Sequence, residues 1–247
     1  MDREREIKKN LQIVEEAITR AAEGAGRRRS DITLIVVTKN FPTSDIEILY
    51  RLGLRDFGEN REQEAREKVE LLGETCPEIR WHFQGQLQRN KLASIGRWAH
   101  MVHSLDDPKY LKGLSDAAVK AERRVKWLIQ LSLDPDYPQT GGEGAGGAGR
   151  AGRGGTDLPG AKEIISTFER AREQLIGLEL VGVMGVAPLG IAPSLAFAQL
   201  NKAFIELSTI YPPLTILSAG MSGDFEAAIH AGATHVRIGS SILGSRA

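Results

Sequence analysis

The sequence predicts a (β/α)8 barrel, one α/β domain that spans residues 1–247. Eight apolar segments recur along the chain, helical patterns separate them, and 247 residues suit one such barrel. Several segments are almost continuously apolar, as expected for parallel strands covered on both faces. The alternative is an open doubly wound sheet, but the first strand ends in VTKNFP and lacks the G-x-G-x-x-G fingerprint of that fold.

The predicted strands are short and follow one another at regular intervals. β-branched and aromatic residues are common in them, as in TLIVV at the start of the first strand. The eight candidates are residues 33–39, 55–60, 80–85, 100–106, 125–134, 178–187, 214–221 and 234–244.

Helical patterns precede and separate these strands. Ile7, Leu11, Val14 and Ile18 recur at helical spacing with charges between them, which predicts an amphipathic N-terminal helix. Gly232 marks the end of a short helix that precedes the last strand. The other predicted helices cover 61–72, 111–122, a segment from about 159, and 194–207.

A glycine-rich segment at about 139–157 interrupts the pattern. QTGGEGAGGAGRAGRGGTD has almost nothing to bury and a high backbone entropy, so it predicts a flexible loop insertion after the fifth strand. It is not a domain boundary, because the α/β alternation resumes after it. Its two arginines could contact an anionic partner, although a plain linker explains them as well.

The composition narrows the functional classes. Lys+Arg and Asp+Glu number 32 each, and this balance gives no support for a nucleic-acid or anionic-membrane binder. The single cysteine, Cys76, fits a reducing compartment. The charged N-terminus has no signal-peptide pattern, and no apolar run is long enough to span a bilayer. We therefore expect a cytoplasmic protein.

Small residues gather at the carboxyl ends of the last two predicted strands. Active sites of this barrel lie at these ends, and the loops after strands seven and eight commonly bind phosphate. Glycine and serine leave backbone N–H groups open to an anion, although each glycine alone could simply serve a tight turn. Two adjacent clusters favour phosphate: Ser218, Gly220, Met221 and Ser222 on the seventh strand, and Gly239, Ser240 and Ser241 on the eighth.

A lysine closes the first predicted strand. The apolar run of TLIVVTKNFP ends at Lys39, and Pro42 follows three residues later. Three interpretations are open: a solvated lysine, a phosphate ligand, or a lysine whose amine forms a Schiff base with a carbonyl. With a phosphate site opposite, on strands seven and eight, the third fits a phosphorylated aldehyde such as pyridoxal 5'-phosphate.

Arg237 supports that interpretation. It lies two residues before Gly239, so both share one face of the eighth strand. An inward arginine needs an acceptor, because an unpaired buried charge is costly, and a pyridine nitrogen would serve. Since arginine stays protonated, it would leave that nitrogen unprotonated and weaken the ring as an electron sink. An outward arginine in a surface ion pair is the alternative.

Other polar residues give weaker signals. His82 in the third strand could be a ligand, but a hydrogen-bonded structural histidine is the commoner case. Glu59 and Asn60 could reach the barrel mouth or cap the following helix, and Asp106 and Asp107 have the pattern of a helix N-cap. The histidines and the cysteine show no metal-ligand spacing.

These motifs resemble the pyridoxal phosphate homeostasis proteins, also called the YggS or PROSC family. Their fold is similar to the N-terminal barrel of alanine racemase, a type III fold of proteins that bind pyridoxal phosphate. The matching segments occur in family order and cover nearly the whole chain. They are VVTKNFP, FGENREQE, WHFQGQLQRNK, VHSLD, LSAGMSGDFEAAIHAGATHVRIGSSILG and, more loosely, LVGVMGVAP.

The resemblance implies specific roles for nine residues. Lys39 would hold the cofactor as a Schiff base, and Arg237 would face the pyridine nitrogen. Asn60 would lie beside the cofactor, and His82 near the pocket. The residues implied at or near the phosphate are Ser218, Met221, Ser222, Gly239 and Ser240.

Three functions are compatible with these residues. The first is a non-catalytic carrier of pyridoxal 5'-phosphate, monomeric and in transient contact with apo-enzymes that need the cofactor. The second is an amino-acid racemase, but Tyr50, Tyr110, Tyr137 and Tyr211 lie in no motif that would provide its second base. The third is a phosphosugar barrel with a Schiff-base lysine, which gives no reason for Arg237. We favour the carrier.

Overall fold

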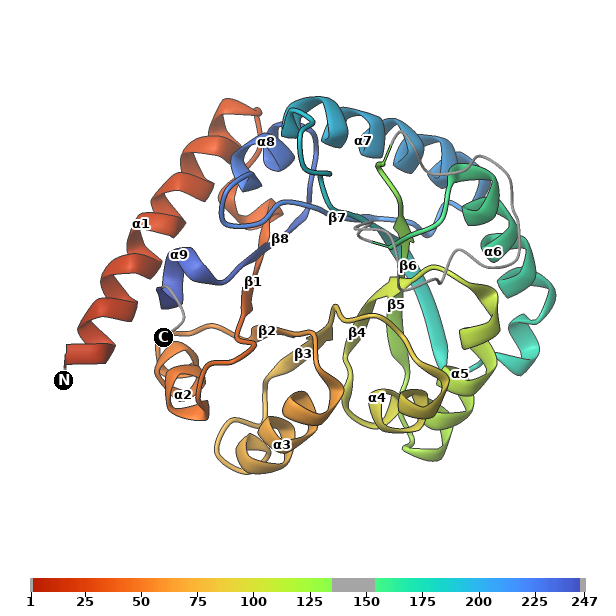
Figure 1. The fold of residues 1–247 in the computed structure, drawn as a ribbon, viewed down its shortest axis with the longest axis horizontal. Helices are drawn as coiled ribbons and strands as arrows, with labels where there is room; N and C mark the ends of the chain where they lie inside the picture. The colour runs from red at the N-terminus through yellow and green to blue at the C-terminus, as the bar shows by residue number, and fades with distance from the viewer. Residues whose placement is uncertain (1, 135–153, 245–247) are drawn as a thin grey trace.

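The computed structural model describes residues 2–134 and 154–244 and confirms the predicted barrel. Eight parallel strands close into a barrel in sequence order, and the helices form a ring around it (Figure 1). The strands are β1 (Thr33–Val37), β2 (Asp56–Glu59), β3 (Arg80–Phe83), β4 (Met101–Leu105), β5 (Val125–Leu131), β6 (Leu178–Gly185), β7 (Ile216–Ser218) and β8 (His235–Ile238).

The helices cover the outside of the barrel, and α1 lies beside the last two of them. None of the described helices is long and apolar enough to cross a membrane. The α-helices are α1 (Asp2–Gly24), α2 (Thr43–Arg51), α3 (Glu62–Leu72), α4 (Leu92–Trp98), α5 (Leu111–Lys120), α6 (Leu158–Arg170), α7 (Pro193–Ile210), α8 (Phe225–His230) and α9 (Ser240–Leu243). Short 3-10 helices occupy Arg29–Asp31, Arg89–Lys91, Pro108–Tyr110 and Arg172–Gln174.

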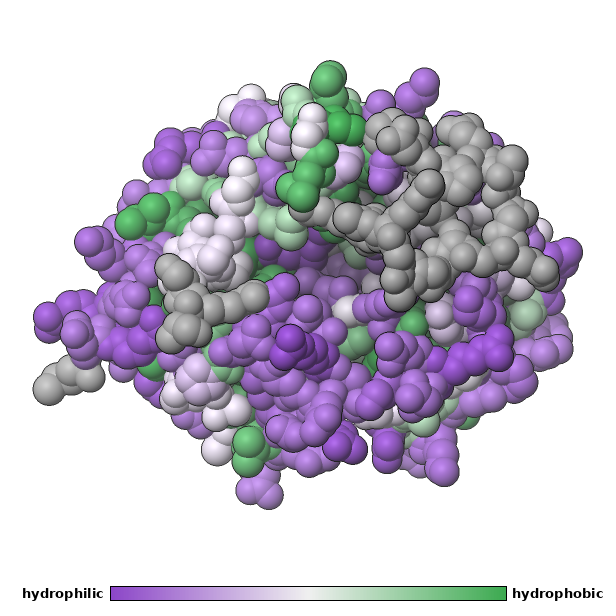
Figure 2. Space-filling model, in the orientation of Figure 1, coloured by the Kyte–Doolittle hydropathy of each residue, from purple (hydrophilic) through white to green (hydrophobic). Residues whose placement is uncertain are grey.

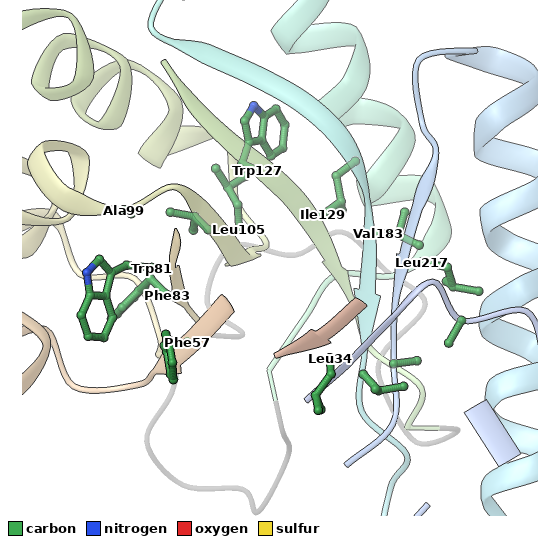
Figure 3. Packing of buried hydrophobic residues seen from close by; sticks show 14 of the residues in the cluster. Leu34, Phe57, Trp81, Phe83, Ala99, Leu105, Trp127, Ile129, Val183 and Leu217 are labelled. Atoms are coloured by element: carbon green, nitrogen blue, oxygen red, sulfur yellow. The ribbon is translucent and has the colours of Figure 1, made fainter. Parts of the chain in front are cut away.

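The strand register sorts side chains into an outer and an inner layer. Neighbouring strands align Ile35 with Arg237 and Gly58 with His82, and alternation places these residues on one face. The other face packs against the helices, where Phe57 and Trp81 lie with ring centroids 6.1 Å apart (Figure 3). A smaller apolar cluster fills part of the interior and consists of Met101, Leu128, Val181 and Met184.

Several observed strands end earlier than predicted: β5 ends at Leu131, β6 at Gly185 and β7 at Ser218, so that Met221 lies in the loop after β7. β1 ends at Val37, so Lys39 lies in the following turn. β8 ends at Ile238, and residues 240–243 form α9, because Ile242 and Leu243 are buried under α1. The sequence analysis named neither α2 nor α4.

Most of the glycine-rich insertion lies outside the described residues, which resume at Gly154. The final part of the predicted segment, residues 154–157, contacts the barrel. Thr156 forms a parallel bridge with Leu131, and the Asp157 side chain accepts a hydrogen bond from the N–H of Gly160 at the start of α6. The predicted flexible segment therefore includes, at its end, residues that belong to the folded domain.

Gly182 in β6 provides a test of the barrel packing. An added Cβ would lie 1.9 Å from the backbone oxygen of Ile216 on β7, so the two strands would have to separate. We expect Gly182→Ala to lower the free energy of unfolding by about 3 kcal/mol, measured by urea denaturation. Gly223→Ala is the control, because no atom lies within 4 Å of its added Cβ. Equal stability of the two variants would contradict this packing.

Candidate functional site

The closure of the barrel brings together the predicted residues from both ends of the chain. β8 pairs with β1, and Arg237 lies directly beside Ile35. Lys39 therefore follows the strand next to Gly239 and Ser240, whereas the sequence analysis had placed it opposite them. Hydrophilic residues surround the centre of the face seen in Figure 2, and apolar residues gather at its upper edge.

The loop that carries Lys39 continues the pairing of β1 with β2. The N–H of Thr38 donates to the carbonyl of Gly58 at 3.0 Å, and the N–H of Phe41 donates back to Thr38 at 3.0 Å. Asn40 between them has a left-handed backbone with φ 63°. Lys39 itself is half-buried. These bonds fix the course of the chain on both sides of the lysine.

A buried ion pair behind this loop holds it from the helix side. Lys68 of α3 donates to Glu59 Oε1 at 2.8 Å, to Glu64 Oε1 at 2.7 Å and to the carbonyl of Thr38 at 2.8 Å. The Thr38 hydroxyl also donates to Glu59 Oε1 at 2.7 Å. Glu59 therefore neither reaches the mouth nor caps a helix. It anchors the residue next to Lys39.

The electrostatics of this ion pair are those of a desolvated carboxylate. Burial raises the pKa of Glu59, while Lys68 and the Thr38 hydroxyl act in the opposite direction. Glu59 has 0% and Lys68 7% of its side chain exposed. Removal of either partner would leave an unpaired buried group directly beneath the Lys39 loop.

The segments that follow β7 and β8 contain small residues and are joined by hydrogen bonds. Gly220 has φ 90°, and its carbonyl accepts from the N–H of Arg237 at 2.9 Å. The N–H of Met221 donates to Asp224 at 2.6 Å, and Ser222 Oγ accepts from the N–H of Ser241 at 3.4 Å. These bonds join the loop after β7 to the start of α9.

Gly239 is required where β8 passes β1. An added Cβ would lie 2.8 Å from the carbonyl oxygen of Val37, so only glycine fits without a shift of the backbone. Ser240 follows it and is exposed. Of the residues predicted to bind the phosphate, Ser218 is therefore buried, whereas Ser240 is exposed at the rim of the barrel.

Ser218 and Arg237 form a buried polar contact inside the barrel. Arg237 is 4% exposed and Ser218 is 0% exposed. The guanidinium donates to Ser218 Oγ at 2.7 Å and to the carbonyl of Gly185 at 3.1 Å. Burial lowers the pKa of Arg237 to about 10. Arg237 points inward, which is one of the two orientations that the sequence left open. No carboxylate among the described residues forms an ion pair with it, and Asp224 acts on it only from a longer distance, in the direction that raises its pKa.

A line of hydrogen bonds continues from Ser218 through the barrel interior. His103 Nδ1 lies 3.0 Å from Ser218 Oγ, and His103 Nε2 lies 2.9 Å from His82 Nδ1. His82 Nε2 lies 2.9 Å from Asp56 Oδ1, which also accepts from Arg80 at 2.8 Å. We call the line Ser218–His103–His82–Asp56 the histidine relay. His103 was not predicted to have a role in the site.

Burial and neighbouring cations keep the interior histidines neutral. Burial, followed by His82, holds the pKa of His103 well below its ordinary value. Burial also lowers the pKa of His100 to about 4 and that of His235 to about 3. Burial alone would raise the pKa of Asp56, but hydrogen bonds from Arg80 and His82 outweigh it and keep the carboxylate ionised.

Besides Glu59 Oε2, two buried polar atoms just after β2 and β3 have no hydrogen-bond partner. They are Asn60 Oδ1 and Gln84 Nε2, an acceptor and a donor as assigned. Gln84 Nε2 lies over Gly58, only 2.5 Å from the position of an added Cβ. Orphaned groups of this kind are rare in protein interiors, and at a strand end they are available to a ligand.

The structure groups the predicted site residues in three places. Lys39 and Asn60 follow β1 and β2, where the polar atom of Asn60 is unpaired. Met221, Ser222, Gly239 and Ser240 form the rim after β7 and β8. Ser218, Arg237 and His82 lie deeper, and both ring nitrogens of His82 are engaged within the relay.

The fold and this site define a barrel of the alanine racemase type. Residues 10–247 match the family described as the alanine racemase N-terminal domain. A protein of Mycobacterium tuberculosis, named pyridoxal phosphate homeostasis protein, is 38% identical over 99% of this chain and 95% of its own length. The chain belongs to the family of the pyridoxal phosphate homeostasis proteins.

Two solved structures are similar over most of the chain. A protein of unknown function from Bifidobacterium adolescentis has a TM-score of 0.83 and 28% identity, covering 98% of this chain and 96% of that one. PipY of Synechococcus elongatus, solved with pyridoxal phosphate bound, has a TM-score of 0.74 and 31% identity, covering 92% of this chain and 100% of PipY.

The buried ion pair beneath the Lys39 loop can be tested by substitution. Lys68→Met would leave the Glu59 carboxylate buried without its cation, so we expect the free energy of unfolding to fall by about 3–5 kcal/mol. Lys112→Met removes an exposed ion pair with Asp116 and should cost less than about 1 kcal/mol. Urea denaturation measures both. A Lys68→Met protein as stable as the control would show that the ion pair does not hold this loop.

The neutral interior histidines predict acid lability. The folded-state pKa values of His100 and His235, about 4 and about 3, lie below the ordinary 6.5. The unfolded chain therefore binds more protons between these values, so the free energy of unfolding falls as the pH drops below 6.5.

We expect a loss of a few kcal/mol by about pH 4, since one pKa unit corresponds to about 1.4 kcal/mol. Urea titrations at several pH values measure it. His100→Gln should flatten the profile, and the exposed His230→Gln should not. A His100→Gln profile identical to that of the unaltered protein would contradict the assignment.

Proposed function

We propose that this chain binds pyridoxal 5'-phosphate covalently at Lys39 and serves as a non-catalytic reservoir for it. One observation carries the proposal. β8 pairs with β1, so Lys39 lies next to Gly239 and Ser240, above a buried Arg237 that has no carboxylate partner among the described residues. The PipY structure, with pyridoxal phosphate bound, supports the choice of ligand.

The residues of the site fit the three functional parts of this molecule. The aldehyde needs an amine, which Lys39 would provide as a Schiff base. The phosphate needs N–H and O–H donors, which Ser218, Gly239 and Ser240 would provide, with Met221 and Ser222 beside them. The unpaired polar atom of Asn60 offers a contact to the ring substituents. His82 would act through the relay, because both of its ring nitrogens are engaged.

Arg237 would determine how readily the pyridine ring accepts electrons. When bound, the cofactor supplies an aldehyde and a pyridine ring that can accept electrons. An arginine donates a hydrogen bond to the ring nitrogen but does not transfer a proton to it, even with its pKa lowered to about 10. The electron sink is then weak, which favours storage of the cofactor over carbanion chemistry.

The positions of the tyrosines support the absence of racemase chemistry. Tyr50 lies in the last turn of α2 and donates to Glu78. Tyr211 follows α7 and packs against Phe168, so both tyrosines lie at the amino-terminal side of the barrel. Tyr110 follows β4 on the mouth side, under Lys109. Tyr137 lies outside the described residues. Among the tyrosines that the structure describes, only Tyr110 lies on the mouth side, where a second base for racemisation would be needed.

A reservoir releases its ligand to proteins that need it. We propose transient encounters with apo-enzymes of the same cofactor class, and a monomer as the working form. The direct experiment is a transfer assay, in which the loaded protein is mixed with an apo-enzyme and the recovery of enzyme activity is followed. Recovery faster than with an equal concentration of free cofactor would support a delivery role.

Covalent binding at Lys39 predicts a spectroscopic signature. Purified protein incubated with pyridoxal 5'-phosphate should gain visible absorbance, and borohydride should fix one cofactor on Lys39, located by mass spectrometry after digestion. Lys39→Ala should lose both the absorbance and the adduct. The exposed Lys112→Ala should keep both, because that residue lies on the outer face of α5 and pairs with Asp116.

Two results would overturn the proposal. The same covalent adduct in Lys39→Ala would remove the lysine assignment. Racemisation of free amino acids well above the uncatalysed rate would remove the non-catalytic assignment, and its loss in Tyr110→Phe would identify the base.

A further inference from the structure

We propose that the histidine relay directs the Ser218 hydroxyl and that phosphate binding at Ser218 draws one proton into the relay. This inference rests on the proposed function, because it assumes a phosphate at Ser218. It concerns His103, His82 and Asp56, which lie below the site and would act on the ligand only through Ser218. They are positioning residues.

The hydrogen bonds restrict how the relay can be protonated. Ser218 Oγ accepts from Arg237 at 2.7 Å and has one proton to donate. At the other end, Asp56 is an ionised carboxylate, so His82 Nε2 must carry the proton of their 2.9 Å contact. His103 lies between them and can donate at only one of its ring nitrogens while it is neutral.

With both histidines neutral, a single arrangement satisfies every contact. His82 donates to Asp56, and its Nδ1 accepts from His103 Nε2 at 2.9 Å. His103 Nδ1 then has only a lone pair, so the Ser218 hydroxyl donates to it across 3.0 Å. In this state the only proton of the Ser218 side chain points down into the barrel and away from the mouth.

A phosphate dianion requires the Ser218 hydroxyl proton to point toward the phosphate and away from His103. For the Ser218 hydroxyl to donate to the phosphate, His103 Nδ1 must become the donor to Ser218. His103 Nε2 then accepts, so His82 Nδ1 must donate to it while His82 Nε2 still donates to Asp56. His82 is then an imidazolium with both nitrogens protonated. The two states differ by one proton, which comes from solvent and is held beside the Asp56 carboxylate.

The charges around the relay oppose an additional proton until an anion arrives. The charged and titratable groups that face it come from five strands or their ends: Asp56 on β2, Arg80 on β3, His100 and His103 at β4, Lys126 on β5, and His235 and Arg237 on β8. Cations outnumber anions in this set, and burial with these neighbours keeps the pKa of His103 low. A bound dianion next to Ser218 would offset that repulsion and stabilise the added proton.

The test compares two ligands that differ only in the phosphate. Pyridoxal 5'-phosphate and 5-deoxypyridoxal share the aldehyde and the ring, so their Lys39 chemistry and its protons cancel in the ratio of dissociation constants. Above about pH 7 the phosphate is a dianion, because its second pKa is about 6. The dissociation constant of 5-deoxypyridoxal divided by that of pyridoxal 5'-phosphate should rise with falling pH. Between about pH 9 and pH 7 we expect this ratio to increase about tenfold for each pH unit.

Calorimetry provides a second readout on the unaltered protein. Titrations in buffers of different ionisation enthalpy give the number of protons that are taken up on binding. Binding of pyridoxal 5'-phosphate should take up close to one proton more than binding of 5-deoxypyridoxal. This measurement needs no substitution, so it stands even if a variant fails to fold. No difference in proton uptake, together with a flat affinity ratio, would overturn the proposal.

His82→Gln is the informative variant. A glutamine amide can donate to Asp56 and accept from His103, as neutral His82 does, but it cannot take up a proton. We expect the pH slope to vanish and binding of pyridoxal 5'-phosphate to weaken by about 10-fold to 100-fold at pH 7, the value of a hydrogen bond to a charged group. Binding of 5-deoxypyridoxal to the same variant is the reference, so that any general effect of the substitution on the site cancels in the ratio.

The outcomes separate this inference from the proposed function. The exposed His230→Gln is the matched control and should retain the slope. An unaltered slope in His82→Gln would contradict the relay. If neither ligand binds the unaltered protein, the proposed function itself fails. If both bind without a phosphate-specific proton, only the relay inference fails.

Discussion

The pairing of β8 with β1 is the contact on which the rest of the site depends. It closes the barrel and aligns Ile35 with Arg237, so residues separated by most of the chain become neighbours. Gly239 makes this close approach feasible, since a side chain there would press on the Val37 carbonyl. Without this closure, Lys39 after β1 and the small residues Gly239 and Ser240 after β8 would lie too far apart to contact the same ligand. The barrel thus defines the site before any single side chain does.

The interior of the closed barrel has an unusual content of polar groups. A barrel interior of this size is normally filled by apolar side chains, as Met101 and Leu128 do here. Beside them, Arg237, His103 and Asp56 are connected by one line of hydrogen bonds through Ser218 and His82. Buried polar groups are stable only when all are satisfied, so each residue restricts the tautomer and orientation of the next. This coupling gives the site a fixed electrostatic character.

Much of the fold and part of the site were predictable from the sequence. Apolar runs and their spacing predict eight strands, and alternation places Arg237 and Gly239 on one face of the last strand. That this face points inward at Arg237 comes from the structure. The relay could not be predicted, because alternation gives the face of each strand but not the height at which residues of non-adjacent strands meet. His103 and Ser218 are 115 residues apart in sequence. Lys68 resembled one more charge on a solvated helix, and only the structure shows it buried against Glu59.

The central claim is that Lys39 and Arg237 hold one ligand across the β1–β8 junction. A crystal structure of the protein with pyridoxal 5'-phosphate tests this most directly. The account predicts continuous electron density from Lys39 Nζ to the ring, the pyridine nitrogen within hydrogen-bond distance of Arg237, and the phosphate at Ser218, Gly239 and Ser240. A ring bound to another lysine, or a phosphate away from β7 and β8, would contradict it.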